Sequence, residues 1–273
     1  MKVVIATMLF LLPSIRIAPP ILKQINSSSY GTFIASFIGK NGIVVSADSR
    51  TVMYDTRGKV VVYYEETSKI FQFRNFLIAA AGQYTFKTSS IRNLIKGTLE
   101  ADSLSILNLY SLHDSLLSYA SGKLSKLEYY SLYMNQFIIA GYDHNIPTIL
   151  YYDGGRRQKF EGKGYITNLE EENDNTSLKE NIAALTVEEL IPVSIDLVKN
   201  VEKLRNEKDK WSIIGGPVST AGIIDNKVSW IKDQNRNSFE SILDFYQAYK
   251  NGKVQIFYRS VKDSTDFPRR FTQ

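Results

Sequence analysis

The sequence predicts an α+β fold, because two kinds of hydrophobic pattern alternate along its 273 residues. Short runs of β-branched and aromatic residues, bounded by glycine, asparagine or aspartate, indicate strands near both ends and in the middle of the chain. Between these runs, apolar residues recur every three or four positions, as on the buried face of a helix. A chain of this length can bury a substantial single core. We therefore expect a leader of residues 1–31 and one domain of residues 32–273.

The leader begins with Lys2, followed by an apolar stretch over residues 3–12. A charged start with about ten apolar residues is similar to a secretory signal and is too short for a stable membrane span. Its cleavage end is poor, because Ala18 is followed by Pro19 and Pro20. Two interpretations stay open, a signal for export and a propeptide whose apolar segment packs on a neighbouring surface. The first places the protein outside the cytoplasm and the second is compatible with the cytoplasm.

The first two predicted strands, residues 31–37 and 42–50, are joined by a short polar turn. In such a hairpin the start of the first strand and the end of the second lie at the same edge. Thr32 and Asp48 are therefore expected at one edge, and Lys69 begins a further strand over residues 69–73. A hydroxyl, a carboxylate and an ammonium group are what an N-terminal nucleophile needs, provided that the chain is cut between Gly31 and Thr32.

The later elements follow in order. A strand at residues 76–82 is followed by helical spacing at 89–96 and from 104 to 120. Strands return at 136–143 and 148–152 and end on a turn at 153–155. Thr186 and Glu189 form a capping-box pattern that opens a helix fading around residues 205–208. Strands at 220–225 and 227–231, a helix at 239–249 and a strand at 254–258 complete the prediction.

Composition excludes several classes of site. The chain has no cysteine, which rules out disulfides and thiolate metal sites, and its two histidines are too isolated for a zinc motif or a Ser-His-Asp triad. We expect no cofactor and no metal. Three of the 33 basic residues lie in the leader, so the chain from Thr32 has 30 basic and 28 acidic side chains. This balance is too even to argue for nucleic acid as a partner.

The run from Gly31 to Gly82 resembles the opening of a proteasome β-type subunit, a member of the N-terminal nucleophile (Ntn) hydrolases. In that family a Gly-Thr junction starts the mature chain, an Ala-Asp-Ser-Arg stands sixteen residues on, a Lys-Ile follows, and a hydrophobic strand closes on Ala-Gly. The matching residues here are Gly31-Thr32, Ala47-Asp48-Ser49-Arg50, Lys69-Ile70 and Ala81-Gly82. The resemblance implies a four-layer α-β-β-α sandwich, with two stacked antiparallel sheets between helical layers. It also implies a peptide or protein substrate and a homo-oligomer or ring assembly.

Two later motifs match the family less closely. The family has an aspartate and a serine three residues apart that touch the N-terminal amine, and Asp209 and Ser212 have this spacing. Two extra residues separate Ser212 from the following glycine pair, and both side chains are also compatible with an ordinary loop. Lys163, between Gly162 and Gly164, occupies the place of a serine that lies next to the nucleophile in catalytic subunits.

The predicted chemistry is hydrolysis through an ester on Thr32. Its own α-amine, with a reference pKa of roughly 7.7–8.0, is the base for the hydroxyl. Lys69 favours deprotonation of neighbouring groups through its positive charge, and Asp48 holds the ammonium group in place. The amide of Gly82 is the expected donor to the oxyanion. Gly31, without a Cβ, lets the chain adopt the strained turn needed for self-cleavage.

Other interpretations of the same residues stay open. Taken singly, Thr32 fits a strand threonine, Asp48 a turn acid and Lys69 an exposed strand end. A catalytically silent, proteasome-like subunit is one alternative, because Lys163 replaces a serine and Phe33 follows the expected nucleophile. An Ntn amidase acting on small amides is the other, because fold does not fix function.

Overall fold

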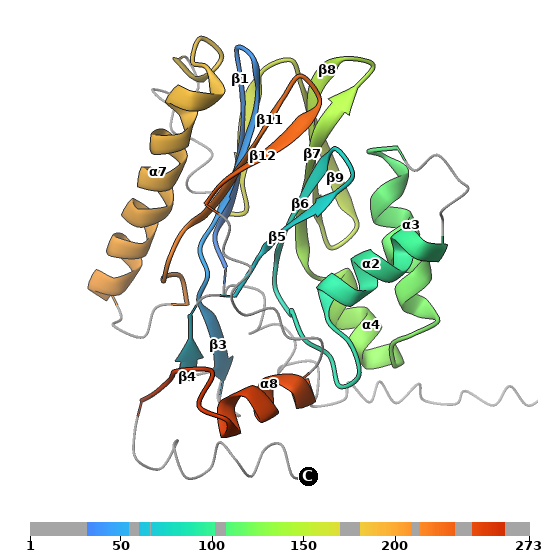
Figure 1. The fold of residues 1–273 in the computed structure, drawn as a ribbon, viewed down its shortest axis with the longest axis vertical. Coiled ribbons are helices and arrows are strands. Elements are labelled where there is room, and N and C mark those ends of the chain that lie inside the picture. Colours follow the sequence, from blue (N-terminus) through green and yellow to red (C-terminus); the bar gives the residue numbers. More distant parts are fainter. Residues whose placement is uncertain are drawn as a thin grey trace, which may run out of the picture.

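The computed structural model describes residues 32–54, 60–65, 67–101, 108–169, 181–208, 213–232 and 242–259. Strands and helices alternate in blocks along this part of the chain (Figure 1). The first strands are β1 (Ile34–Gly39), β2 (Gly42–Ala47), β3 (Thr51–Tyr54), β4 (Val60–Tyr64), β5 (Ile70–Phe73) and β6 (Phe76–Ala81). Then come α2 (Ile91–Ala101), α3 (Ser111–Ser121), α4 (Lys126–Tyr133), β7 (Gln136–Asp143), β8 (Ile146–Asp153), β9 (Arg156–Glu161) and β10 (Gly164–Thr167). The last are α7 (Val187–Lys208), β11 (Ser219–Ile224), β12 (Lys227–Lys232), α8 (Ile242–Lys250) and β13 (Ile256–Tyr258).

The strands of this part of the chain form three antiparallel sheets. The first has the order β10-β1-β2-β11-β12, the second β5-β6-β7-β8-β9, and a small third sheet β13-β4-β3. The hairpin of β1 and β2 pairs Ile34 with Ala47 and Gly39 with Gly42, which leaves a two-residue turn between the strands. The first hairpin predicted from the sequence is thereby confirmed.

Both faces of β1 are buried, and this places the first sheet between two apolar layers. Ile34 and Ile38 belong to a hydrophobic cluster that also contains Ala79 and Ile138 of the second sheet. The alternate residues Ala35 and Phe37 pack instead against α7. Because successive side chains of a strand point to opposite faces, one strand contributes to both clusters.

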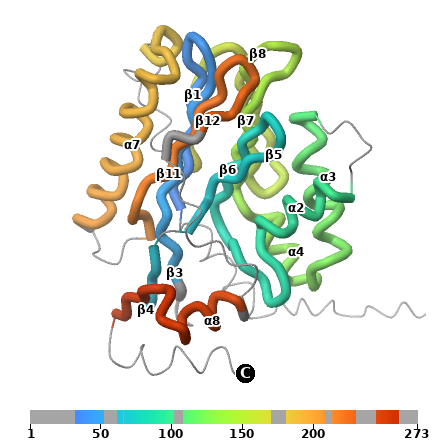
Figure 2. Tube along the Cα trace, in the orientation of Figure 1, coloured from blue at the N-terminus to red at the C-terminus, as the bar shows by residue number. Residues whose placement is uncertain are grey.

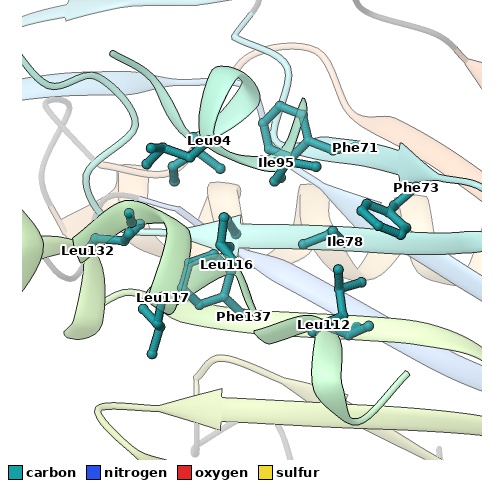
Figure 3. Close-up of a cluster of buried hydrophobic side chains, with 14 of the residues drawn as sticks. Phe71, Phe73, Ile78, Leu94, Ile95, Leu112, Leu116, Leu117, Leu132 and Phe137 are labelled. Atoms are coloured by element: carbon teal, nitrogen blue, oxygen red, sulfur yellow. The ribbon is translucent and has the colours of Figure 1, made fainter. Parts of the chain in front are cut away.

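The second sheet has helices on its outer face. Helices α2, α3 and α4 cover it with apolar side chains that meet those of β5, β6 and β7 (Figure 3). In Figure 1, α7 lies on the opposite side of the molecule from α2, α3 and α4, with strands of both large sheets between them. The fold is thus mixed, with antiparallel sheets and packed helices, and it is compatible with a sandwich. The small third sheet and α8 lie together beyond one end of the large sheets (Figure 2).

Helix α4 and strands β9 and β10 were missed by the sequence patterns. Helix α4 buries only Leu132, so its apolar periodicity is weak, although Ser125 and Glu128 form a capping box at its start. Strand β9 is an edge strand with mostly exposed side chains, and it lacks the alternation that marks a half-buried strand. Strand β10 is only four residues long. Short or exposed elements of this kind carry little hydrophobic signal.

Most of the other predicted elements are confirmed with shifted ends. The helix expected at 104–120 is seen as α3, and residues 102–107 lie outside the described residues. Strand β8 starts at Ile146, two residues earlier than expected. The capping box of α7 is formed, with the Glu189 amide donating to the Thr186 hydroxyl at 3.4 Å and the Thr186 amide donating to the Glu189 carboxylate at 2.8 Å. No helix in the described ranges is long and apolar enough to cross a membrane.

Candidate functional site

The candidate site lies where strands of both large sheets end. Thr32 precedes β1 and Asp48 follows β2, so the antiparallel hairpin places them at one end of the first sheet. Lys69 precedes β5 and Gly82 follows β6, and these strands also pair antiparallel. Each large sheet therefore contributes two of the four predicted residues, at the ends of two neighbouring strands.

An ion pair joins the first and the second sheet at these strand ends. The Lys69 Nζ lies 3.0 Å from the Asp48 Oδ1, and both side chains are 0% exposed. The same ammonium group donates to the carbonyl oxygen of Arg50 at 2.5 Å. Lys69 is thus a fully buried cation and not the exposed strand end that the sequence also allowed. Isolated buried charges are so unfavourable that they persist only when paired and hydrogen-bonded, as this one is.

The carboxylate of Asp48 receives further hydrogen bonds from the backbone. Its Oδ1 accepts from the Phe33 amide at 2.8 Å, and its Oδ2 accepts from the Gly215 amide at 2.9 Å and the Arg50 amide at 3.2 Å. A Cβ on Gly215 would lie 2.5 Å from the guanidinium carbon of Arg50, so a side chain at this position would displace Arg50. The contact with Phe33 fixes the residue that directly follows Thr32.

Burial shifts both members of the ion pair toward their neutral forms. Loss of solvation raises the pKa of Asp48 above its ordinary value of 3.8, and the charge of Lys69 and the amide donors oppose this rise. Loss of solvation likewise lowers the pKa of Lys69 below its ordinary value of 10.5, with Asp48 opposing the fall.

Thr32 is itself buried, with 3% of its surface exposed. Its carbonyl oxygen accepts a hydrogen bond from the Asn168 side-chain amide at 2.7 Å. That amide also donates to the Gln136 side chain at 3.1 Å, and the Asn168 Oδ1 accepts from the Ile34 amide at 2.9 Å. The backbone around Thr32 is therefore held on one side by Asp48, through Phe33, and on another by Asn168.

Gly82 occupies a position that requires glycine. Its φ of +126° is unfavourable for other residues, and a Cβ would lie 2.0 Å from the Asn135 Oδ1. Asn135 fixes the following residue, because its side chain both accepts from the Gln83 amide and donates to the Gln83 carbonyl, each at 2.8 Å. Two residues further on, the ring of Tyr84 lies with its centroid 6.0 Å from the Lys69 Nζ.

The structure corrects the expectation for Lys163. The register of β1 and β10 pairs Ile38 with Gly164 and Ala35 with Thr167, so Lys163 lies beside the far end of β1. At about 3.3 Å per residue, this is on the order of 20 Å from Thr32 along the strand. The resemblance had aligned a Gly-x-Gly turn, which is a weak motif, with the wrong end of β10. The residue beside Thr32 is Asn168, at the opposite end of that strand.

Asn168, Asn135 and Gly215 were missed as contributors to this site. The available signal was a polar residue directly after a short apolar strand, as in Ile166-Thr167-Asn168, or directly before one, as in Asn135-Gln136-Phe137. Asp209 and Ser212 lie outside the described residues. Among the residues that are described, no group of three or more metal-ligating side chains could hold a metal ion.

The comparisons with known proteins concern the fold. No protein-family model matches the chain, and no curated protein matches it. A solved structure, the Anbu (Gly-1) mutant from Hyphomicrobium sp. strain MC1, is similar with a TM-score of 0.52 and 14% sequence identity. The match covers 82% of this chain and 95% of that one. This likeness concerns the fold alone, and it supports a proteasome-like, Ntn-type fold at a coarse level.

Proposed function

We propose that this protein is a threonine-type hydrolase of the N-terminal nucleophile class that cleaves peptide bonds. In this proposal the chain is cut between Gly31 and Thr32, and residues from Thr32 onward form one domain with the four-layer α-β-β-α arrangement. The observation that carries it is the fully buried ion pair of Lys69 and Asp48, which is joined through the Phe33 amide to the backbone at Thr32.

A buried ion pair at this place needs a chemical reason. Two charges are costly to remove from water, and an apolar pair of similar size is often at least as stable. The pair stands at the ends of β2 and β5, directly beside the residue whose hydroxyl matches the nucleophile of the resembling family. In the proposal, the Lys69 ammonium acts on the Thr32 hydroxyl through its positive charge.

The proposed reaction uses Thr32 twice. Its α-amine, freed by cleavage after Gly31, accepts the hydroxyl proton while the Oγ1 attacks the carbonyl carbon of the substrate. The Lys69 ammonium lowers the free energy of the developing negative charge, and Asp48 keeps the ammonium group oriented. The Gly82 amide donates to the oxyanion. The amine of the substrate leaves with the transferred proton, and water then hydrolyses the ester on Thr32.

The remaining assignments complete the proposal. Asp209 and Ser212 are proposed to contact the freed amine and to orient it, as their counterparts do in the resembling family. Residues 1–31 act as the segment removed on maturation. The mature chain associates with copies of itself, which limits access to the site to unfolded or short peptides.

Turnover of defined substrates tests this function. Purified full-length protein and its Thr32→Ala variant are incubated with a library of fluorogenic peptides and, in parallel, with small amides. We expect peptide cleavage by the unaltered protein and a loss of about 10³-fold or more in the variant, since the nucleophile is removed. Thr85→Ala, a threonine in the segment between β6 and α2, is the matched control and should retain full activity.

The outcomes separate the proposal from its alternatives. Turnover of small amides without cleavage of any peptide would identify an amidase. A protein that retains residues 1–31 and cleaves neither class of substrate would be a silent subunit. Peptide cleavage that survives Thr32→Ala unchanged would rule out the proposed nucleophile.

A further inference from the structure

We infer that Asn168 is a positioning residue that fixes Thr32 relative to both sheets. This inference rests on the proposed function, because it assigns Asn168 a part in placing the nucleophile. Asn168 directly follows β10, and only 6% of its surface is exposed.

Both polar atoms of the Asn168 side chain are hydrogen-bonded. Its Oδ1 accepts from the Ile34 amide at 2.9 Å, and its Nδ2 donates to the Thr32 carbonyl at 2.7 Å and to the Gln136 Oε1 at 3.1 Å. Its own backbone amide donates to the Ile34 carbonyl at 3.2 Å, which extends the pairing of β10 with β1. Four hydrogen bonds therefore connect this one residue to Thr32, Ile34 and Gln136.

These contacts bridge the two sheets at the site. Thr32 and Asn168 lie at the end of the first sheet, whereas Gln136 begins β7 in the second sheet. Gln136 pairs with Ala81, the residue before the proposed oxyanion donor Gly82. The chain of amides from the Thr32 carbonyl through Asn168 to Gln136 thus ties the nucleophile to the strands that carry the oxyanion donor.

This bridge constrains an atom that the ion pair does not contact, the carbonyl oxygen of Thr32. Asp48 holds only the Phe33 amide, which leaves the peptide plane between Thr32 and Phe33 able to tilt about that contact. Asn168 holds the carbonyl oxygen of the same peptide group, so the two contacts together fix the orientation of the plane to which the Thr32 Cα is attached. In reactions of this kind, a misplacement of about 1 Å can lower the rate by about 10²-fold.

The substitution Asn168→Asp separates positioning from folding. It preserves size and the acceptor for Ile34, but it replaces the Nδ2 donor by an oxygen facing the Thr32 carbonyl and the Gln136 Oε1. The Thr32 backbone would be pushed away, and a carboxylate would be introduced near the freed amine. A nearby negative charge raises the pKa of an amine.

The experiment measures kcat, KM and the pH dependence of kcat/KM with a peptide that the unaltered protein cleaves. For Asn168→Asp we expect kcat to fall about 10–100-fold with KM within about threefold, because binding precedes the misplaced attack. The acidic limb of the pH profile, which reports deprotonation of the amine, should move to higher pH. Asn41→Asp is the matched control for the kinetics, since the Asn41 side chain, which accepts from the Val187 amide and is hydrogen-bonded to Glu188, lies at the far turn of the β1–β2 hairpin.

A second variant guards against a folding defect. Gln136→Met removes the acceptor in the second sheet and leaves the bond from Asn168 to Thr32 in place, so we expect a milder fall in kcat of about threefold to tenfold. An unshifted pH profile together with unaltered kcat in both variants would overturn the role of Asn168 and leave the proposed function standing. Failure of the unaltered protein to free Thr32 and to turn over any peptide or amide would instead overturn the proposed function, and this inference with it.

Discussion

Two buried titratable sites of this molecule are built in opposite ways. At the strand ends, Asp48 and Lys69 bury two opposite charges and surround them with backbone hydrogen bonds. In the helical region over the second sheet, His113 is buried between aromatic rings, stacked on Tyr152 at 3.9 Å and edge-on to Phe137 at 5.4 Å.

The difference separates a buried group that stabilises the core from a buried pair whose burial opposes stability. His113 is an amphipathic side chain that packs as a neutral ring, and its burial adds to the core around α3. The ion pair, in contrast, is buried at a large cost in solvation free energy. Buried, perturbed titratable groups of this kind are typical of functional sites. The following predictions, from the largest effect to the smallest, test this contrast.

Lys69→Met should have the largest effect. It leaves the Asp48 carboxylate buried without its cation, so we expect the free energy of unfolding to fall by about 3–5 kcal/mol. Activity should fall by about 10²–10⁴-fold even under conditions where the variant is folded. Urea unfolding and peptide turnover measure the two effects. Lys96→Met, at a side chain that is 72% exposed and 3.9 Å from Glu100, should change stability by less than about 0.5 kcal/mol.

The double variant Asp48→Asn with Lys69→Met tests whether the two residues act as a pair. Removing both charges leaves no unpaired ion, so the loss of stability should be smaller than the sum of the two single losses by about 1–3 kcal/mol. Activity should not recover, because neither residue can then assist Thr32. A double-mutant cycle in urea measures the coupling. Strictly additive losses would show that the ion pair is not a unit.

His113 should make the stability depend on pH in a predictable direction. Burial lowers the pKa of His113 below its ordinary value of 6.5, and Asp114, at 3.7 Å, opposes this shift. The unfolded chain therefore binds a proton at a higher pH than the folded chain. Stability from this group is complete above about pH 6.5 and falls, by up to about 1.4 kcal/mol per pH unit, as the pH decreases toward the folded pKa.

His113→Phe should remove this loss, which urea unfolding at several pH values between about 7 and 5 can show. His144→Asn is the control, because the His144 side chain is 92% exposed and its φ of +49° suits asparagine. An equal decrease in stability for the His113→Phe variant and the unaltered protein would contradict the assignment.

Ser125→Ala should have the smallest effect. The Ser125 hydroxyl accepts from the Glu128 amide at 3.4 Å and caps α4. Loss of this cap should decrease the free energy of unfolding by about 1 kcal/mol. Turnover should not change, since α4 belongs to the helical layer on the outer face of the second sheet. Ser118→Ala, on the exposed side of α3, serves as the control. A fall in kcat for Ser125→Ala would mean that the helical region and the strand ends are not independent.

The sequence predicted the parts of the fold that have a strong local signal. The hairpin of β1 and β2 followed from two apolar runs joined by a short polar turn, and the start of α7 followed from its reciprocal cap. Exposed or short elements such as α4 and β9 were not found, because burial of one face is what produces the pattern. The small sheet that joins β13 to β4 depends on pairing between distant segments, which no local pattern contains.

The site was predictable only in part. Spacing placed Asp48 near the start of β1, but the contact with Lys69 depends on how the two sheets stack. Asn168 forms hydrogen bonds to residues more than a hundred positions earlier, including Thr32, and its position after a short apolar strand does not indicate these partners. Lys163 was placed wrongly because a glycine-flanked turn does not specify which end of a strand it adjoins.

Intact-mass analysis of the purified protein, before and after treatment with an epoxyketone or a β-lactone that reacts with nucleophilic threonine, tests the central claim most directly. We predict a mass that corresponds to a chain beginning at Thr32 and a single adduct on that residue, both absent in Thr32→Ala. A chain that keeps residues 1–31 and forms no adduct would contradict it.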